Sequence, residues 1–375
     1  MANPLLSRFS LGLLLTCLTI TLSPCASSTE EQYKLTLQGN GYESARTSFP
    51  GLQFKWDRHE SLLEQMSLDM EVELQWAGLD RYDAADLREL SLSYRPGPWQ
   101  LGVGLSRVFW GVTESRHLVD VVNQVDLRFD PDGDARLSQP MASVGYRGLG
   151  RNVTLYALPC YRERPDALIF GEHGAQDPAY EQAIFTPLRC SGQTDFAVRA
   201  TQVAGPADIG LSYFRGHSRE PYAGHSPASS DPTYPEVNRF AVDTQVTLGA
   251  WLLKLEALLQ DSEHGIDRAS VSGFEYTWVS AFNGASDLSL LYEHLTDTRC
   301  DSVIASCGEM LGIRWIANDV ADTNLLVSSV RDRQNGLWGL KVQGSRRIDE
   351  QLSLLLNSGG MYRARYLSVG LSYAF

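Results

Sequence analysis

The last ten residues of the chain alternate between large apolar side chains and small or polar ones. One face of this extended segment carries Leu367, Val369, Leu371, Tyr373 and Phe375. A strand needs this period of two when one face meets apolar material and the other meets water. In a soluble protein such a terminal strand would leave a bare edge that invites aggregation, whereas a closed barrel pairs its last strand with its first. The segment therefore predicts a membrane-spanning barrel.

The aromatic residue at the end of this strand adds a resemblance. Phe375 closes an amphipathic strand, and such an ending resembles the C-terminal signal of Gram-negative outer-membrane barrels. The resemblance implies that Phe375 is an assembly signal and that the barrel assembly machinery is a partner. It also implies the cell outer membrane as the location, with membrane lipid and lipopolysaccharide around the wall.

The amino-terminal residues are typical of an export signal. Residues 1–8 are short and carry a positive charge, residues 9–23 form an apolar run, and residues 26–28 are small. This order is that of a secretory signal peptide, and the run is too short for a spanning helix. We expect residues 1–28 to be removed and residues 29–375 to form one barrel domain.

The composition after this signal makes a barrel the expected membrane fold. No uninterrupted apolar stretch is long enough to span a bilayer as a helix. The 16 Tyr, 8 Trp and 13 Phe can form aromatic girdles. A secreted soluble β protein would show similar strands, but the inward faces are too polar to form a dry core. The net charge of −13 argues against nucleic acid as a partner.

The connections between candidate strands alternate in length and polarity. The short set is 95–98, 147–151, 203–207, 248–250, 282–286, 318–322 and 346–350. The longer, more polar set is 78–86, 108–139, 161–193, 215–236, 261–268, 296–308, 329–335 and 358–364. Short periplasmic turns and long outer loops are the asymmetry of bacterial outer-membrane barrels. We therefore expect both ends of the barrel domain on the periplasmic side.

The strands themselves follow the same alternation. Residues 68–76 are the clearest example, because apolar residues there alternate with carboxylates and an amide. About eighteen segments qualify, and the two near 33–40 and 51–57 are the weakest. The predicted fold is all-β, an antiparallel transmembrane barrel of about sixteen to eighteen strands. Such a barrel is too wide for side chains to fill, so its lumen should hold water.

Four cysteines follow the export signal, and an oxidising compartment favours their pairing. They are Cys160, Cys190, Cys300 and Cys307. Three pairings are possible. Each of two predicted outer loops holds two cysteines, so Cys160–Cys190 and Cys300–Cys307 is the simplest choice. No Cys/His spacing indicates a zinc site.

One stretch, residues 107–128, leaves the strand pattern. It follows a strand, lacks alternation and is too apolar for an exposed loop. We expect the long loop 108–139 to fold into the barrel and narrow the pore, where charged groups tune ion selectivity. The constriction candidates are Arg107, Trp110, Glu114, Arg116, His117, Asp120, Asn123, Asp126 and Arg128. A surface loop that covers the barrel mouth is the alternative.

The same stretch resembles a segment of uncharacterised Gram-negative porin-like barrels. That segment has Trp-Gly after a strand, followed by Asp-x-x-Asn-Pro-x-Asp. Trp110 with its following glycine, Asp120, Asn123 and Asp126 match it, whereas Gln124 stands where those proteins have proline. The resemblance implies a porin-like protein and leaves the substrate open.

Catalytic and metal-binding interpretations of this region are less favoured. Ser115, His117 and Asp120 are the residue types of a hydrolytic triad, but neighbours two apart do not face each other as Ser–His proton transfer requires. Glu114, His117 and Asp120 would suit a metal only on one helical face, and a solvated polar face is commoner. Residues 130–134 are similar to part of a calcium loop that lacks its closing glutamate. We predict no enzyme activity, cofactor or metal.

The expected function is passive diffusion of small hydrophilic solutes or ions through the barrel. The lumen-facing candidates carry both signs of charge and leave the ion preference open. They are Glu71, Glu73, Arg95, Lys254, Glu256, Arg314 and Lys341. One alternative is a non-conducting barrel whose outer loops bind a partner or a surface polymer, and another is a transporter for hydrophobic molecules. Assembly into a homo-oligomer is left open.

Overall fold

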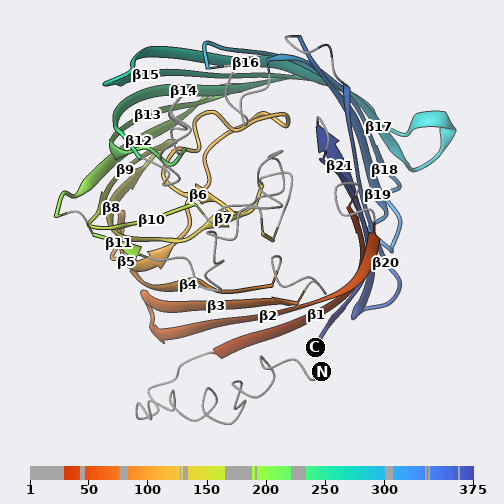
Figure 1. The fold of residues 1–375 in the computed structure, drawn as a ribbon, viewed down its shortest axis with the longest axis horizontal. Coiled ribbons are helices and arrows are strands. Elements are labelled where there is room, and N and C mark those ends of the chain that lie inside the picture. Colours follow the sequence, from red (N-terminus) through yellow and green to blue (C-terminus); the bar gives the residue numbers. More distant parts are fainter. Residues whose placement is uncertain are drawn as a thin grey trace.

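The computed structural model describes residues 29–375 except 43–46, 77–82, 127, 130–133, 165–187, 191, 221–233, 300–306, 334–335, 337 and 362–363. The described residues form a closed antiparallel barrel of 18 strands (Figure 1). This confirms the all-β barrel and the larger of the two predicted strand numbers. The predicted signal peptide, residues 1–28, lies outside the described residues.

The strands follow one another round the wall in chain order. They are β1 (Thr29–Tyr42), β2 (Thr47–Leu63), β3 (Met66–Trp76), β4 (Ala84–Tyr94), β5 (Trp99–Ser106), β8 (Gln139–Gly148), β9 (Arg151–Leu158), β12 (Asp195–Ala204), β13 (Ala207–His217), β14 (Glu236–Leu248), β15 (Trp251–Ser262), β16 (Gly265–Trp278), β17 (Asp287–Asp297), β18 (Gly308–Ile316), β19 (Asn324–Asp332), β20 (Trp338–Arg347), β21 (Leu352–Met361) and β22 (Ala364–Ala374). A single 3₁₀ turn, η3 (Ala281–Asn283), lies between β16 and β17 in the described chain.

The barrel closes where β22 pairs with β1. Tyr33 and Phe375 exchange two backbone hydrogen bonds, of 3.0 and 2.9 Å, and their rings stack with centroids 5.4 Å apart. On the inner face of this seam the Thr36 hydroxyl donates to the Ser372 hydroxyl at 3.1 Å. The alternating final segment is therefore a barrel strand, as the sequence predicts.

Turns of two to eight residues make one end of the barrel, and the longest connections, 107–138, 159–194 and 218–235, lie at the other. We call these the short-turn end and the long-loop end. Two of the predicted longer connections, 261–268 and 358–364, are wrong, because only two residues separate β15 from β16 and β21 from β22. Glycines make several of the short turns, since Gly150 and Gly249 adopt φ of 66° and 62°, a left-handed conformation that costs glycine little. The predicted turns fall between the observed strands, and an additional one at Glu64 and Gln65 joins β2 to β3.

The two strands that were weakest in the sequence are long in the structure. β2 runs on to Leu63, well past the predicted end near residue 57. Its outward Arg58 and Glu60 break the apolar pattern of a membrane-facing side. Arg58 forms ion pairs with Glu31 of β1 at 3.1 Å and with Glu60 at 2.7 Å, so the two strands satisfy these charges between them.

The inner surface is not uniformly polar, which corrects one expectation from the sequence. An apolar cluster lies inside the ring, formed by the chain between β5 and β8 together with inward residues of the wall. It contains Trp110, Leu118, Val119, Val121, Val122, Met141, Leu158, Ala197, Phe214, Val237, Ala241, Leu258, Ala269, Val271 and Leu295. Apolar residues of β13 to β17 therefore form a dry core where the chain between β5 and β8 covers them, and buried charged residues such as Glu256 and Glu293 lie on the same inward faces.

The disulfide between Cys160 and Cys190 is confirmed, with a Cα–Cα distance of 4.4 Å. It joins two short paired strands, β10 (Tyr161–Arg162) and β11 (Leu188–Arg189). Cys307 is also disulfide-bonded. Its predicted partner, Cys300, lies outside the described residues. No helix in the described part of the chain has the length and hydropathy of a membrane span.

Candidate functional site

The chain between β5 and β8, residues 107–138, lies inside the barrel (Figure 1). We call it the inserted segment. It contains one two-residue strand pair, β6 (Gln124–Val125) with β7 (Arg136–Leu137). The segment reaches from β5 to β18, where Glu114 contacts Arg314. β18 lies half-way round the wall from β5. The segment therefore crosses the interior.

Apolar packing holds the segment against one side of the lumen. Val119 and Val122 are fully buried, and they belong to the same cluster as Phe214 of β13 and Val271 of β16. Trp110 is tilted against Tyr156 of β9 with ring centroids 5.8 Å apart. Burial of this kind contributes about 1.5–3 kcal/mol for each large side chain. The segment is thus a packed part of the fold.

A buried glutamate on β15 fixes the backbone of the segment. Glu256 is fully buried, and its Oε1 accepts hydrogen bonds from the N–H groups of Val112 and Thr113 at 2.7 and 3.0 Å. The Thr113 hydroxyl donates to the same oxygen at 2.8 Å, and the Val119 N–H donates to Oε2 at 3.2 Å. One carboxylate therefore satisfies four donors that strand pairing would otherwise have to satisfy.

A second glutamate, on β17, does the same for the next two residues. Glu293 is 2% exposed and accepts the N–H groups of Glu114 and Ser115, both at 2.8 Å. The Ser115 hydroxyl also donates to Glu293. We call Glu256 and Glu293 the two anchoring glutamates. They hold residues 112–119 of the segment against the wall.

The charged side chains of the segment meet opposite charges on the wall. The Glu114 carboxylate lies 2.7 Å from the Arg314 guanidinium and 3.6 Å from the Lys254 ammonium. Arg314 in turn pairs with Glu275 of β16 at 3.0 Å. Burial alone would raise the pKa of Glu114, but Arg314 and Lys254 outweigh it and lower this pKa below its ordinary value. Glu114 is therefore ionised at neutral pH.

A second charged group lies toward the long-loop end. Arg116 pairs with Asp297 at 2.7 Å and with Glu220 at 3.6 Å, and Arg299 pairs with both of these carboxylates at 2.9 Å. Burial alone would raise the pKa of Glu220. Its neighbours Arg299, Arg116 and Arg239 outweigh that effect and lower it to about 2. The group joins the segment to the chain that follows β13 and β17.

The base of the segment is held by its own polar residues. Asn123 is 1% exposed, and its Oδ1 accepts from the Val108 N–H at 2.9 Å while its Nδ2 donates to the carbonyls of Ser106 and Leu137. Separately, the Asp120 carboxylate accepts from Arg136 at 2.7 Å. These bonds tie the outgoing and returning strands of the segment together.

The remaining candidates connect the segment to β4. Asp126 is fully buried between Arg88 of β4 and Arg128, each 3.0 Å away. Above it, Arg162 of β10 pairs with Asp86 of β4, and its N–H donates to Gln139 at 2.8 Å. The disulfide-closed loop therefore rests on the return of the segment to the wall.

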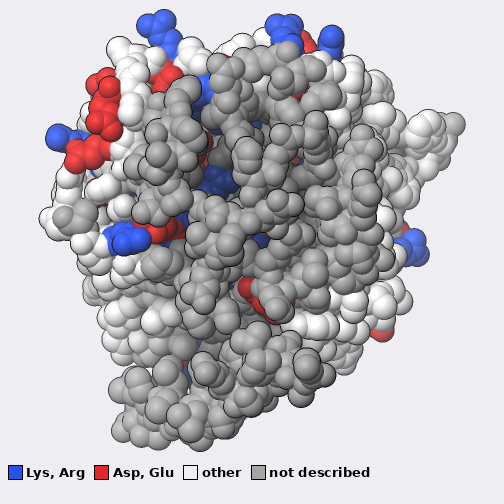
Figure 2. All heavy atoms as spheres, in the orientation of Figure 1, with Lys and Arg blue, Asp and Glu red and all other residues white. Residues whose placement is uncertain are grey.

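The opposite inner surface, on β2 to β4, is more open. Lys55 and Asp57 form an ion pair at 3.2 Å, with side chains 34% and 35% exposed. His59 and Asp69 are 2.5 Å apart and similarly accessible. Arg107, the first residue of the segment, pairs with Glu71 at the edge of this surface. The long-loop half of β3 and β4, with Asp86 and Arg88 buried, lies under the inserted segment. We call the short-turn half of β2 to β4 the open wall, and the inward faces of β13 to β17 the covered wall. Figure 2 shows charged side chains of both signs at the rim and inside the opening.

The structure brings the nine constriction candidates together in one segment. His117 packs edge-on against Phe109 with ring centroids 4.8 Å apart. Among the lumen-facing candidates, Glu71, Lys254, Glu256 and Arg314 lie on the inner face in contact with the segment. Glu73 lies on the same face and pairs with Arg88 of β4. Lys341 of β20 reaches Asp134 of the segment at 3.1 Å. Arg95 is exposed in the turn after β4, outside this group.

Sequence reasoning missed Glu293, Asp297 and Glu220. A signal for the first two exists on β17. Its inward Leu291 and Leu295 are buried, although its outward residues are apolar as well. Large apolar residues on the inward face of a strand that is also apolar outward indicate that something covers part of its inner side. Glu220 carries no such signal, because it lies in a loop.

The contacts argue against the catalytic and metal-binding interpretations. The Ser115 hydroxyl donates to Glu293 and Asp120 binds Arg136, so neither is bonded to His117. In the part of the chain that the structure describes, no group of three His, Cys, Asp or Glu residues is placed to hold a metal ion. Most of the calcium-like turn, residues 130–133, lies outside that part.

The barrel is similar in fold to several solved structures. OccK2 (OpdF) of Pseudomonas aeruginosa, in complex with glucuronate, aligns with a TM-score of 0.59 and 11% identity over 93% of this chain and 96% of that one. OccK8 (OprE) of the same organism gives 0.57 and 11% over 93% and 98%. A loop-deletion mutant of OmpT from Vibrio cholerae gives 0.46 and 13% over 93% and 100%. The chain shares the β-barrel fold of OccK2 and OccK8. Neither a family model nor a curated protein matches the sequence.

Proposed function

We propose that this protein is an outer-membrane channel for passive diffusion of small hydrophilic solutes or ions. The observation that carries the proposal is the division of the inner surface. An 18-stranded ring is too wide for side chains to fill, and the inserted segment covers only one side of it. On the other side, charged residues such as Lys55 and Asp57 remain accessible to water. A passage alongside the open wall accounts for both.

The inserted segment then sets the size and charge of that passage. Arg107 stands where the segment leaves the wall and faces the carboxylates of the open wall. Ions pass such a constriction according to the charges that line it. The other charged candidates, such as Arg116 and Asp126, are paired with the wall and act by holding the segment in place. This separates residues that select from residues that position.

The orientation follows from the same proposal. The short-turn end faces the periplasm, the long-loop end faces outward, and residues 1–28 direct export. Phe375 serves as the signal for the assembly machinery, and it lies beside the seam with β1. The lipid-facing side is supported by large exposed apolar residues such as Leu211, Phe240 and Leu371.

Single-channel recording tests the proposal. The protein is refolded in detergent, inserted into a planar bilayer and recorded under a salt gradient. We expect steady conductance that rises when residues 112–119 are replaced by a short Gly-Ser linker, because the passage widens. The outward substitution Glu60→Gln is the control, and it should leave the current unchanged.

A silent barrel would contradict the proposal, provided that heat-modifiable migration on gels shows that the barrel is folded. That result would favour the non-conducting alternative, in which the disulfide-closed loop at Cys160 and Cys190 binds a partner. An apolar solute that crosses while salts do not would favour a hydrophobic transporter.

A further inference from the structure

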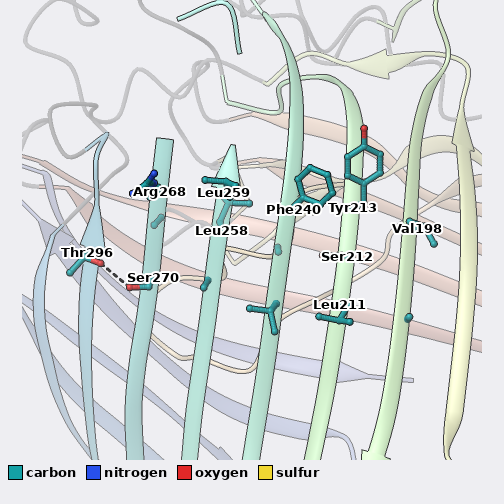
Figure 3. Close-up of a pocket in the computed structure, with 15 residues that line it drawn as sticks. Val198, Leu211, Ser212, Tyr213, Phe240, Leu258, Leu259, Arg268, Ser270 and Thr296 are labelled. Carbon is teal, nitrogen blue, oxygen red and sulfur yellow. Dashed lines mark hydrogen bonds between the residues drawn. The ribbon is translucent and has the colours of Figure 1, made fainter. Parts of the chain in front are cut away.

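A groove of about 710 Å³ lies on the wall across β12 to β16 (Figure 3). It faces away from the lumen. On β15 the residues Lys254, Glu256 and Leu258 are buried against the inserted segment, whereas Leu255 and Leu259 are exposed on the other face. Strand alternation places Ala257 on that outer face as well, and Ala257 lines the groove.

Small outward residues form the floor of the groove. Ala257 and its cross-strand partner Ser270 are the small residues of its floor. The larger Leu211, Phe240 and Leu259 border the groove, as Figure 3 shows. The volume is in the range of about 300–1,000 Å³ typical of small-molecule sites. The outer wall here is indented in a region whose neighbouring side chains are large and apolar.

Cationic groups lie at the long-loop end of the groove. One row of paired residues runs Tyr213, Phe240, Leu259 and Arg268. The next row toward the long loops begins with Arg215 on β13. Both arginines are exposed, and within the described chain neither forms an ion pair. Asp261 shares the row of Arg215 but pairs with neither arginine in that part of the chain.

The spacing of the two arginines is informative. They lie three strands and one row apart, which is about 16 Å for strands separated by about 4.8 Å and residues that rise about 3.4 Å along a strand. Hydroxyl groups lie near Arg268, since Ser270 and Thr296 share a hydrogen bond of 2.8 Å on the same outer face. Two separated cations above an apolar groove match a lipid whose headgroup carries two phosphates and whose tails are acyl chains. Guanidinium groups bind phosphate through paired, charge-assisted hydrogen bonds.

We propose that this groove is a binding site for the diphosphorylated, multiply acylated glycolipid that anchors lipopolysaccharide. One acyl chain runs from Arg268 over Ser270 and Ala257, beside Leu259. The two phosphates contact Arg268 and Arg215. The proposal rests on the orientation given under Proposed function, in which the long-loop end meets the outer leaflet.

Lipid retention by the refolded full-length barrel tests this site. Diphosphoryl lipid A is titrated into the protein in detergent, and native mass spectrometry measures the bound fraction. We expect one lipid to bind each wild-type barrel. R268A should weaken binding about tenfold, as expected for the loss of a hydrogen bond between charged groups. A257L should weaken it as well, because the larger side chain fills the floor of the groove.

A matched control comes from another outward arginine. Arg331 of β19 is exposed, stacks on Trp338 at 5.7 Å and lies away from the groove. R331A removes the same charge and should leave lipid binding unchanged. Equal loss in R331A and R268A would mean non-specific attraction between a cationic rim and phosphate, and would overturn the proposal.

Two further outcomes would also overturn it. If R268A and A257L both bind lipid A like the wild type, the groove is not the lipid site. If the lipid-free wild type forms dimers or trimers that A257L separates, the groove is a contact between copies of the chain. Single-channel current is recorded for each variant in parallel. A barrel that conducts but binds no lipid would contradict only this inference. A barrel that binds lipid but does not conduct would contradict only the proposed function.

Discussion

The open wall and the covered wall both carry rows of carboxylates, and they differ in what those carboxylates contact. On the covered wall, Glu256 and Glu293 are buried and accept backbone N–H groups of the inserted segment. On the open wall, Asp57 and Asp69 pair with side chains and remain about one-third exposed. A carboxylate that satisfies backbone donors fixes the position of a chain segment. One that stays in water contributes to the potential of the passage instead.

Replacing the two anchoring glutamates should produce the largest effect on current. In the double variant E256Q/E293Q, each side chain replaces one of its two acceptor oxygens with an NH₂ group. That NH₂ group faces backbone N–H groups that still need an acceptor. Hydrogen bonds to a charged group contribute about 1.5–3 kcal/mol each, so residues 112–119 should detach from the covered wall. We expect a wider or fluctuating conductance in single-channel recordings.

Glu275 provides the matched control for that experiment. It contacts the side chains of Arg314 and Lys254 and no backbone of the segment. E275Q should therefore leave the conductance close to that of the wild type. Equal effects of E275Q and the double variant would show that charge, and not backbone anchoring, sets the current.

Neutralising the open wall should have a smaller effect, on selectivity. The double variant D57N/D69N removes two accessible negative charges, so the reversal potential under a salt gradient should shift toward anions. A charge about 4 Å from an ion in water contributes about 1 kcal/mol, which limits the change in permeability ratio to less than about tenfold for each charge. An unchanged reversal potential would mean that ions do not pass the open wall.

Removing the disulfide should act mainly on stability. The bridge closes a loop with a sequence separation of 30, and such a loop stabilises a folded chain by about 3–4 kcal/mol. C160S/C190S should lower the thermal unfolding temperature. The current should change little, because Arg162 still binds Asp86 and Gln139. A large change in conductance would assign the loop a direct part in the constriction.

Acidification should have the smallest effect at mild pH. The pKa of Glu220 is lowered from 4.5 to about 2, so the folded state holds its proton less tightly than the unfolded chain. Its stabilising contribution is complete above about pH 4.5 and is lost as the pH falls toward 2. Thermal unfolding measured from pH 6 to pH 2 should show this loss in the wild type and a flatter dependence in E220Q. Parallel curves would exclude Glu220 as the group responsible.

The wall could be predicted from the sequence because alternation is a local signal. Residues 68–76 show it without help from any other strand, and β3 covers the same residues. In β2, outward Arg58 interrupts the signal, and its partner Glu31 lies on β1. The pattern weakens where a strand depends on its neighbour to satisfy a charge.

The site could be predicted only in part, because its contacts are distant in sequence. The departure of residues 107–128 from alternation identifies the segment. Its partners Glu256 and Glu293 lie 144 and 179 residues from the groups that they bind at Val112 and Glu114. Nothing in the sequence around Glu256 and Glu293 distinguishes them from other inward carboxylates. Only the buried leucines of β17 indicate that this wall is covered.

The seam between β1 and β22 also constrains how the molecule forms. Every other pairing in the wall joins wall strands that follow one another in the chain, whereas Thr36 and Ser372 meet across 336 residues of chain. Contacts of such long range form slowly, since a large loop entropy must be overcome first. Until they form, both edges of the growing sheet have unpaired backbone groups. Pairing of β1 with β22 is therefore the last step in closing the barrel. A chain interrupted before this step exposes two unpaired strand edges at once.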